Sequence, residues 1–83
     1  MYYRFRTHDF CWVIVPRQIG REIRWEIGTD TDGIYCGFGN YARPEQGAED
    51  IAMQETYNGE WDSLPDDQIP QSIIDISNWE VHK

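Results

Sequence analysis

The second half of this chain is rich in carboxylates, which are the most numerous chemically active side chains there. Residues 44–83 hold ten acids and one cation, Lys83, whereas residues 1–43 hold six arginines and five acids. Ten acids against one lysine leave −9, and six arginines against five acids leave +1, which together give the −8 of the whole chain. An acidic surface repels nucleic acid and anionic membranes and attracts basic protein surfaces. The charge pattern therefore predicts a basic protein partner.

The spacing of the first acids places three of them on one exposed helix face, because Glu45, Glu49 and Asp50 lie four or five residues apart. No Lys or Arg interrupts the acids from residue 44 to residue 82. Aromatic side chains among carboxylates are typical of binding hot spots, and the acidic half holds three: Tyr57, Trp61 and Trp79. Spacing leaves open whether Trp61 and Trp79 are core or interface. A solvated face that aids solubility is the competing interpretation. The predicted partner-binding residues are Glu45, Glu49, Asp50, Glu60, Trp61, Asp62, Asp66 and Asp67.

Metal coordination and catalysis are less consistent with the sequence. A zinc site needs closely spaced pairs of ligands, and only two of the four candidate ligands are near each other in the chain. Asp30 and Asp32 before Gly33 resemble part of a calcium loop, but the later Glu ligand is missing, and Asp-Gly is a preferred hairpin turn. No local motif joins a cysteine nucleophile to a base. We expect no enzyme activity and no cofactor. The candidate zinc ligands are His8, Cys11, Cys36 and His82.

A glycine pair and an arginine-rich start give two further alternatives. Gly37 and Gly39 lie between a strand and a helix, but the third glycine of a nucleotide loop is absent. Arginines interleaved with aromatics are typical of sheets that bind single-stranded nucleic acid. Cross-strand pairing of the arginines with acids explains the same pattern, and the net charge favours it. This second hypothesis rests on Tyr2, Tyr3, Arg4, Phe5, Arg6, Arg24 and Trp25.

Length and composition indicate one small domain, residues 1–83. A chain of this size buries only about 60% of its unfolded surface, and twelve aromatic residues offset that with large buried areas. No run approaches the roughly 20 apolar residues of a membrane span, and the start lacks the apolar core of a signal peptide. We expect a cytoplasmic protein, a monomer or weak dimer, whose two cysteines are free thiols.

The longest helix is predicted over residues 44–58. Pro44 suits the first helical position, Glu45 suits the first turn, and Gly59 suits the residue that closes a helix. The buried stripe is thin, so the helix must lie close against a flat layer. The stripe, at spacings of three and four, is Tyr41, Pro44, Ala48, Ile51, Ala52 and Glu55.

Strands are predicted before this helix. Residues 2–6 and 10–15 favour strands, with residues 7–9 a bulge or bend in one long central strand, and residues 16–20 read as a turn. Residues 21–27 alternate apolar and charged. Asp32-Gly33 predicts a hairpin turn into a strand at 34–38, with Ile34, Cys36 and Phe38 facing the core.

The last third is harder to interpret. Residues 62–71 read as an irregular loop, residues 72–76 as a helical turn or a short strand, and residues 78–82 as a fourth strand at the sheet edge. The predicted fold is α+β, a three- to four-stranded antiparallel sheet with one amphipathic helix across one face, in the order β-β-β-α plus a C-terminal segment. The predicted core is Trp12, Ile14, Ile23, Trp25, Ile27, Ile34, Phe38, Ala48 and Ile51.

The length and the carboxylate run from Glu45 to Glu80 resemble the small acidic phage-encoded inhibitors, including anti-CRISPR proteins, many of which mimic DNA. The order of elements, with the stretch YARPEQGAEDIA, is also similar to HicB-type antitoxin domains, without their DNA-binding appendage. The first resemblance implies a non-catalytic inhibitor or adaptor that docks on a nucleic-acid-binding protein and does not bind nucleic acid itself. A structural or assembly protein that associates through an edge strand is the third hypothesis.

Overall fold

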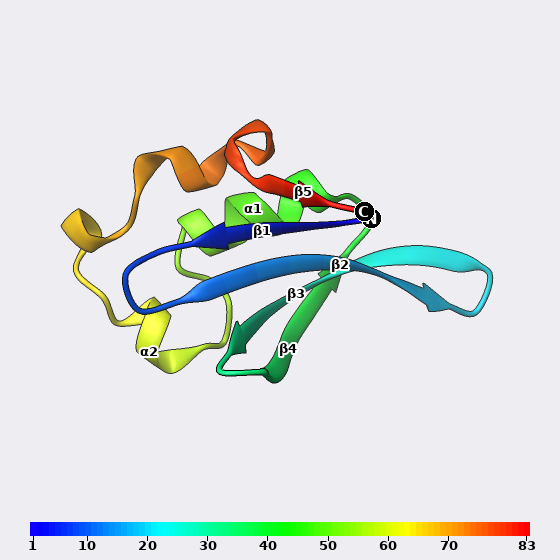
Figure 1. Ribbon diagram of the computed structural model, residues 1–83, viewed down its shortest axis with the longest axis horizontal. Coiled ribbons are helices and arrows are strands. Elements are labelled where there is room, and N and C mark those ends of the chain that lie inside the picture. Colours follow the sequence, from blue (N-terminus) through cyan, green and yellow to red (C-terminus); the bar gives the residue numbers. More distant parts are fainter.

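The computed structural model describes residues 1–83 and shows an α+β fold in which five antiparallel strands form one sheet (Figure 1). The spatial order is β4-β3-β2-β1-β5, and every neighbouring pair is antiparallel. The sheet has more strands than the three or four that the sequence predicts. The elements are β1 (Tyr2–Arg6), β2 (Cys11–Ile19), β3 (Glu22–Thr31), β4 (Ile34–Tyr41), α1 (Pro44–Ala52), α2 (Gly59–Asp62), the 3₁₀ turns Asp66–Gln68, Gln71–Ile74 and Ile76–Asn78, and β5 (Glu80–His82).

The first difference between the predicted and the observed fold lies at the start of the chain. Residues 2–15 were predicted as one long bent strand, and this is wrong because they form two strands. β1 and β2 form a hairpin, with Tyr3 opposite Ile14 and Phe5 opposite Trp12. The Thr7 N–H donates to the Phe10 carbonyl at 2.8 Å, and the Phe10 N–H donates to the Thr7 hydroxyl at 3.1 Å. A threonine hydroxyl thus closes a tight turn that contains neither Gly nor Pro, the usual turn signals.

The β2–β3 hairpin is longer than predicted and projects beyond the helices (Figure 1). β2 continues through Pro16, which lies opposite Trp25, and the turn falls at Gly20 and Arg21. Gly20 has a φ of 61°, which glycine adopts without a steric penalty. No helix covers this end, so Ile23 is 52% exposed and its prediction as a core residue is wrong.

The Asp32-Gly33 turn is confirmed, since both residues have positive φ, 53° and 79°, as a type I′ hairpin turn requires. The strand that follows, β4, is not buried as predicted. Ile34 is 69% exposed and Cys36 is exposed, because α1 packs nearer the other end of this strand. A register irregularity at Ile27 and Gly28 accompanies this edge.

The core lies between the sheet and α1. Trp12, Ile14, Ile27, Ala48 and Ile51 are buried as predicted, and Trp25 and Phe38 pack against them partly buried. Three further residues complete the core from the last third of the chain, which the sequence left open. These are Trp61, Ile73 and Trp79.

Helix α1 starts at Pro44, as predicted, but ends at Ala52, six residues before the predicted end. The chain leaves the helix because Gln54 takes a φ of 57° and its amide donates to the carbonyls of Trp61 and Leu64, at 2.9 and 2.8 Å. Gly59 opens α2 instead of closing α1. The Asn58 side chain caps α2 by accepting from the N–H groups of Glu60 and Trp61.

The C-terminal segment returns along the sheet through the three 3₁₀ turns. The predicted edge strand is confirmed as β5, which pairs with β1 with Tyr3 opposite Val81. The stretch that was open between helical turn and strand forms 3₁₀ structure, and its Ile73 is buried. The Trp79 indole N–H donates to the Ile73 carbonyl at 2.8 Å, which fixes this segment over the core.

A close approach of α1 to the sheet gives the first prediction. A Cβ on Gly47 would lie 2.7 Å from Cγ2 of Ile27, a buried β-branched side chain with little freedom to move. We expect Gly47→Ala to lower the free energy of unfolding by about 1–3 kcal/mol, because overpacking outweighs the better helix propensity of alanine. Urea denaturation of the natural chain and the variant measures this change in the free energy of unfolding. Glu49→Ala, exposed on the same helix, is the control, and an equal effect of both would contradict the packing argument.

Candidate docking surface

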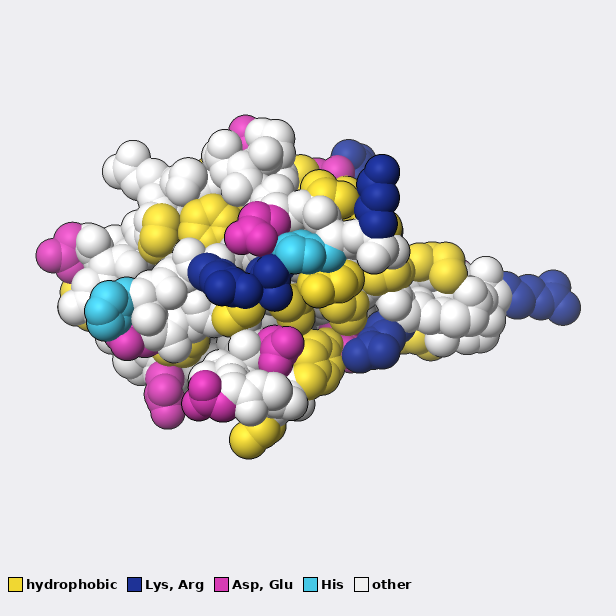
Figure 2. All heavy atoms as spheres, in the orientation of Figure 1, with side chains coloured by type: hydrophobic (Ala, Val, Ile, Leu, Met, Phe, Trp, Pro, Cys, Tyr) yellow, Lys and Arg dark blue, Asp and Glu magenta, His cyan; other side chains and the backbone are white.

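Charge is segregated in the folded molecule. Residues 44–79, which form α1, α2 and the 3₁₀ turns, contain nine acids and no Lys or Arg. Only one of these acids makes an ion pair, Glu45, whose carboxylate lies 3.5 Å from Nε of Arg43. Figure 2 shows Lys and Arg side chains over the sheet and at the end of the projecting hairpin. The acids of residues 44–79 are therefore not neutralised by the arginines of residues 1–43.

The structure separates the predicted partner-binding residues into two groups. Glu49 on α1, Glu60 on α2, and Asp66 and Asp67 in the first 3₁₀ turn are exposed, so their carboxylates are accessible. Asp50 and Glu45 are half-buried. These residues remain candidates for the docking surface.

Trp61 and Asp62 have structural roles instead. Trp61 is 0% exposed, packs edge-on against Trp12 at 5.4 Å between ring centroids, and donates its indole N–H to the Ile51 carbonyl at 2.8 Å. It cannot reach a partner, so its place in the predicted set is corrected. The Asp62 carboxylate accepts from the N–H and hydroxyl of Thr56, and from the N–H of Tyr57, and so holds the loop before α2.

Tyr57 is the exposed aromatic of the acidic region. It is 90% exposed and has a φ of 69°. With Tyr41, Asp50, Glu55 and Asp62 it lines a hollow of about 390 Å³. Tyr57 was one of three aromatics in the acidic half, and sequence spacing could not tell which of them faces solvent. A tyrosine beside three carboxylates suits a Lys or Arg side chain, which can meet both the charges and the ring face.

The pKa of the Tyr41 hydroxyl reflects the negative potential inside this hollow. Burial raises the pKa of its hydroxyl, and a hydrogen bond to Asp50 and the negative charge of Glu55 raise it further. Ionising the phenol would add another anion to a carboxylate cluster, and this explains why the pKa of Tyr41 is raised. The same potential favours an incoming cation.

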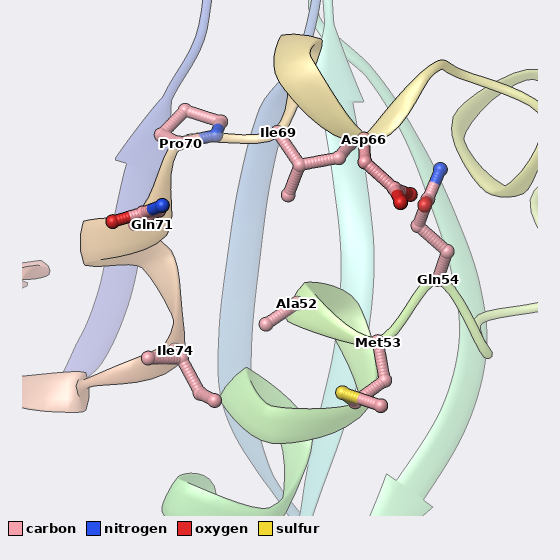
Figure 3. A pocket seen from close by; sticks show the side chains of 8 residues that line it. All are labelled: Ala52, Met53, Gln54, Asp66, Ile69, Pro70, Gln71 and Ile74. Atoms are coloured by element: carbon pink, nitrogen blue, oxygen red, sulfur yellow. The ribbon is translucent and has the colours of Figure 1, made fainter.

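An apolar groove lies on the other side of α1, where Figure 3 shows Met53 and Ile74 on opposite walls. Its volume is about 430 Å³, and the side chains of Gln54 and Asp66 lie next to each other at one end. The remaining lining residues come from the end of α1 and from the 3₁₀ turns; they are Ala52, Ile69, Pro70 and Gln71.

The residues of the nucleic-acid hypothesis are divided between the two faces of the sheet. Tyr3 packs on Trp25 and Phe5 on Trp79, with ring centroids 5.8 and 5.5 Å apart, so these aromatics belong to the core side and are not free to stack on bases. Arg4 lies 3.5 Å from Glu80. Tyr2 stacks on His82, and the Nε of Arg24 donates to the side chain of Asn40.

Tyr35, on the face opposite the core, gives a pH prediction. Burial and a hydrogen bond to Glu26 raise the pKa of Tyr35 to about 12. Because the unfolded phenol ionises near 10, the unfolded state holds fewer protons between pH 10 and 12, and we expect the free energy of unfolding to fall as pH rises through this window. Absorbance titration near 295 nm should show a late phase to which Tyr35 and Tyr41 both contribute, and Tyr35→Phe should reduce its amplitude by one tyrosine. An unchanged late phase in that variant would contradict the assignment to Tyr35.

No group of three or more His, Cys, Asp or Glu side chains is placed to hold a metal ion. Cys11 and Cys36 are free thiols, as predicted. No helix is long and apolar enough to cross a membrane. Comparison with models of protein families, with characterised proteins and with solved structures finds no match.

Proposed function

We propose that this protein is a non-catalytic inhibitor or adaptor that docks its acidic side on a basic protein surface, such as the groove of a cytoplasmic nucleic-acid-binding protein. The observation that carries the proposal is the acidic surface around Tyr57, in a segment that contains no cation. Asp50 and Glu55 line one hollow with Tyr57, and Glu60 lines a second hollow with it. An exposed tyrosine surrounded by carboxylates supplies both the anchor and the charge that a basic partner requires.

The likeness in size and charge to phage-encoded inhibitors of the DNA-mimic class agrees with this proposal. Carboxylates without neutralising cations present a charge pattern to which a nucleic-acid groove is complementary. Direct binding of nucleic acid by this face is disfavoured by the same charges, because non-specific affinity for nucleic acid comes from phosphate contacts with Lys and Arg.

The test is a pull-down from bacterial lysate with the natural chain and with the double variant Glu55→Gln, Glu60→Gln, read by mass spectrometry. We expect the natural chain to retain basic proteins at low salt and to lose them near about 0.5 M salt, where exposed charges are screened. The double variant should retain at least about tenfold less, because both lost charges face the partner.

The control also loses two negative charges, but far from Tyr57. It combines Glu22→Gln on the projecting hairpin with Asp75→Asn at the residue that caps the last 3₁₀ turn. Asn in place of Asp75 keeps the capping oxygen that accepts from the Ser77 N–H. We expect this control to retain the same proteins as the natural chain. If the two double variants behave alike, the acidic surface around Tyr57 is not the docking site.

A further inference from the structure

The two edges of the sheet differ in how they are protected. β5 is three residues long, and short edge strands discourage pairing with other chains. β4 is eight residues long and pairs only with β3. It contains no Pro, Lys or Arg, which are the residues that usually block an edge.

The hairpin turn fixes which backbone groups of β4 are free. In a two-residue hairpin turn the flanking residues, here Thr31 and Ile34, exchange hydrogen bonds, and the next pair along the ladder does not. That next pair is Asp30 and Tyr35. The N–H and C=O of Tyr35 therefore point away from β3, toward the open edge.

A second hollow runs beneath this part of β4. Its volume is about 620 Å³, and Tyr57 lines both. β4 supplies Ile34, Cys36 and Phe38 to its wall, and Asp9, Asp32 and Glu60 also line it. An added strand at the edge would direct every second side chain toward this hollow, because side chains alternate between the faces of a sheet.

We propose that β4 accepts an extended basic segment of the partner as a sixth strand, beside residues Ile34 to Gly37. Apolar side chains of that segment enter the second hollow, and the Lys or Arg side chains that alternate with them lie on the outer face, the face of Asp30. Asp32 and Glu60, which line the hollow, add to the negative charge around the segment. This inference rests on the proposed function for the basic character of the partner. It adds the manner of docking, which is main-chain pairing at an edge with side-chain specificity.

A second copy of this chain is the poorer occupant. Pairing two β4 edges would bring Asp30, Asp32 and Glu60 of each copy toward those of the other, in molecules that each carry −8. Like charges placed directly opposite destabilise strand pairs. Charge complementarity therefore favours a basic strand of another protein.

The probe is a short capped peptide in which Lys and Val alternate, with two control peptides. One control carries N-methyl groups on alternate residues, which removes backbone donors without changing charge, and the other replaces Lys by Glu. We expect the Lys-Val peptide to bind the natural chain and to slow hydrogen exchange of the Tyr35 amide. N-methylation should weaken binding by about tenfold or more, because it prevents the strand ladder from forming. The Glu peptide should not bind.

Three outcomes would overturn the inference. They are equal affinity of the N-methylated peptide, absence of binding by the Lys-Val peptide, or exchange protection of other segments without protection of Tyr35. A dimer seen by light scattering that protects the Tyr35 amide from hydrogen exchange, and that the peptide does not displace, would also overturn it in favour of a second copy.

A variant pair connects this test to the natural partner. Tyr35→Pro removes the outward N–H, and Tyr35→Ala removes the same side chain while keeping that N–H. We expect Tyr35→Ala, but not Tyr35→Pro, to retain basic proteins in the pull-down, with circular dichroism showing whether each is folded. Equal retention by two folded variants defeats the edge inference and leaves the proposed function standing. Failure of the natural chain to retain basic proteins defeats the proposed function instead. If Tyr35→Pro is unfolded, the peptide comparison decides.

Discussion

Trp61→Ala is expected to lower the free energy of unfolding by about 3–5 kcal/mol, the usual effect of emptying a large aromatic site in a core. Trp61 is fully buried, its ring packs edge-on against Phe10 at 5.1 Å and Trp12 at 5.4 Å, and its indole N–H satisfies the Ile51 carbonyl. The variant leaves a cavity between the sheet and the loop after α1, and it removes one of the two donors to that carbonyl, which still accepts from the Gln54 N–H at 3.1 Å. In a small domain this is a large share of the total stability.

Urea denaturation followed by far-ultraviolet circular dichroism measures the effect. Trp61→Phe separates the two contributions, because it keeps much of the ring volume and loses only the N–H donor. We expect it to be less destabilising than Trp61→Ala. A Trp61→Ala variant with native stability that no longer binds the partner would place Trp61 in the interface after all.

Tyr57→Ala is expected to do the reverse: to leave the fold intact and to weaken partner binding. At 90% exposure the side chain adds little to stability, so the free energy of unfolding should change by less than about 0.5 kcal/mol. As the anchor of a hot spot, its loss should raise the Kd by about 30-fold or more, equivalent to about 2 kcal/mol. Tyr57 lines both hollows beside β4, so truncating it removes contacts from each.

Isothermal titration calorimetry against a basic protein recovered in the pull-down measures the Kd. Tyr57→Phe is the control, because it keeps the ring face that a Lys or Arg side chain would cover. We expect the phenylalanine variant to bind within a few-fold of the natural chain. Unchanged affinity of Tyr57→Ala would remove Tyr57 from the docking surface.

The predicted fold was correct where local chemistry acts alone. Asp32-Gly33 formed the hairpin turn because its two positive φ angles suit Asp and Gly, and Pro44 started α1 because its missing N–H has no partner at a helix start. The turn at Thr7 was missed because its signal is a side-chain hydroxyl that accepts from the Phe10 N–H. Once that turn is recognised, one predicted strand becomes two, and the sheet has five strands.

The candidate site, like the fold, could be predicted only in part. The run of acids was visible in the sequence, and the structure pairs only its two ends with arginines, Glu45 with Arg43 and Glu80 with Arg4. The choice between Tyr57, Trp61 and Trp79 as the exposed aromatic could not be predicted. That choice depends on how the chain turns at Gln54, whose amide donates to two carbonyls beyond Tyr57.

The charge asymmetry of this protein, the α+β class and much of the core between Trp12 and Ile51 follow from composition and local periodicity, so the amino acids alone were enough to predict them. The burial of Trp61 and Trp79, the exposure of Ile23 and Ile34, and the open edge of β4 beside Tyr57 became visible only once the chain was folded. Burial depends on what packs against a residue, which no local pattern contains. Alternation along a strand marks which face could be buried, but the short helix α1 covers only part of that face.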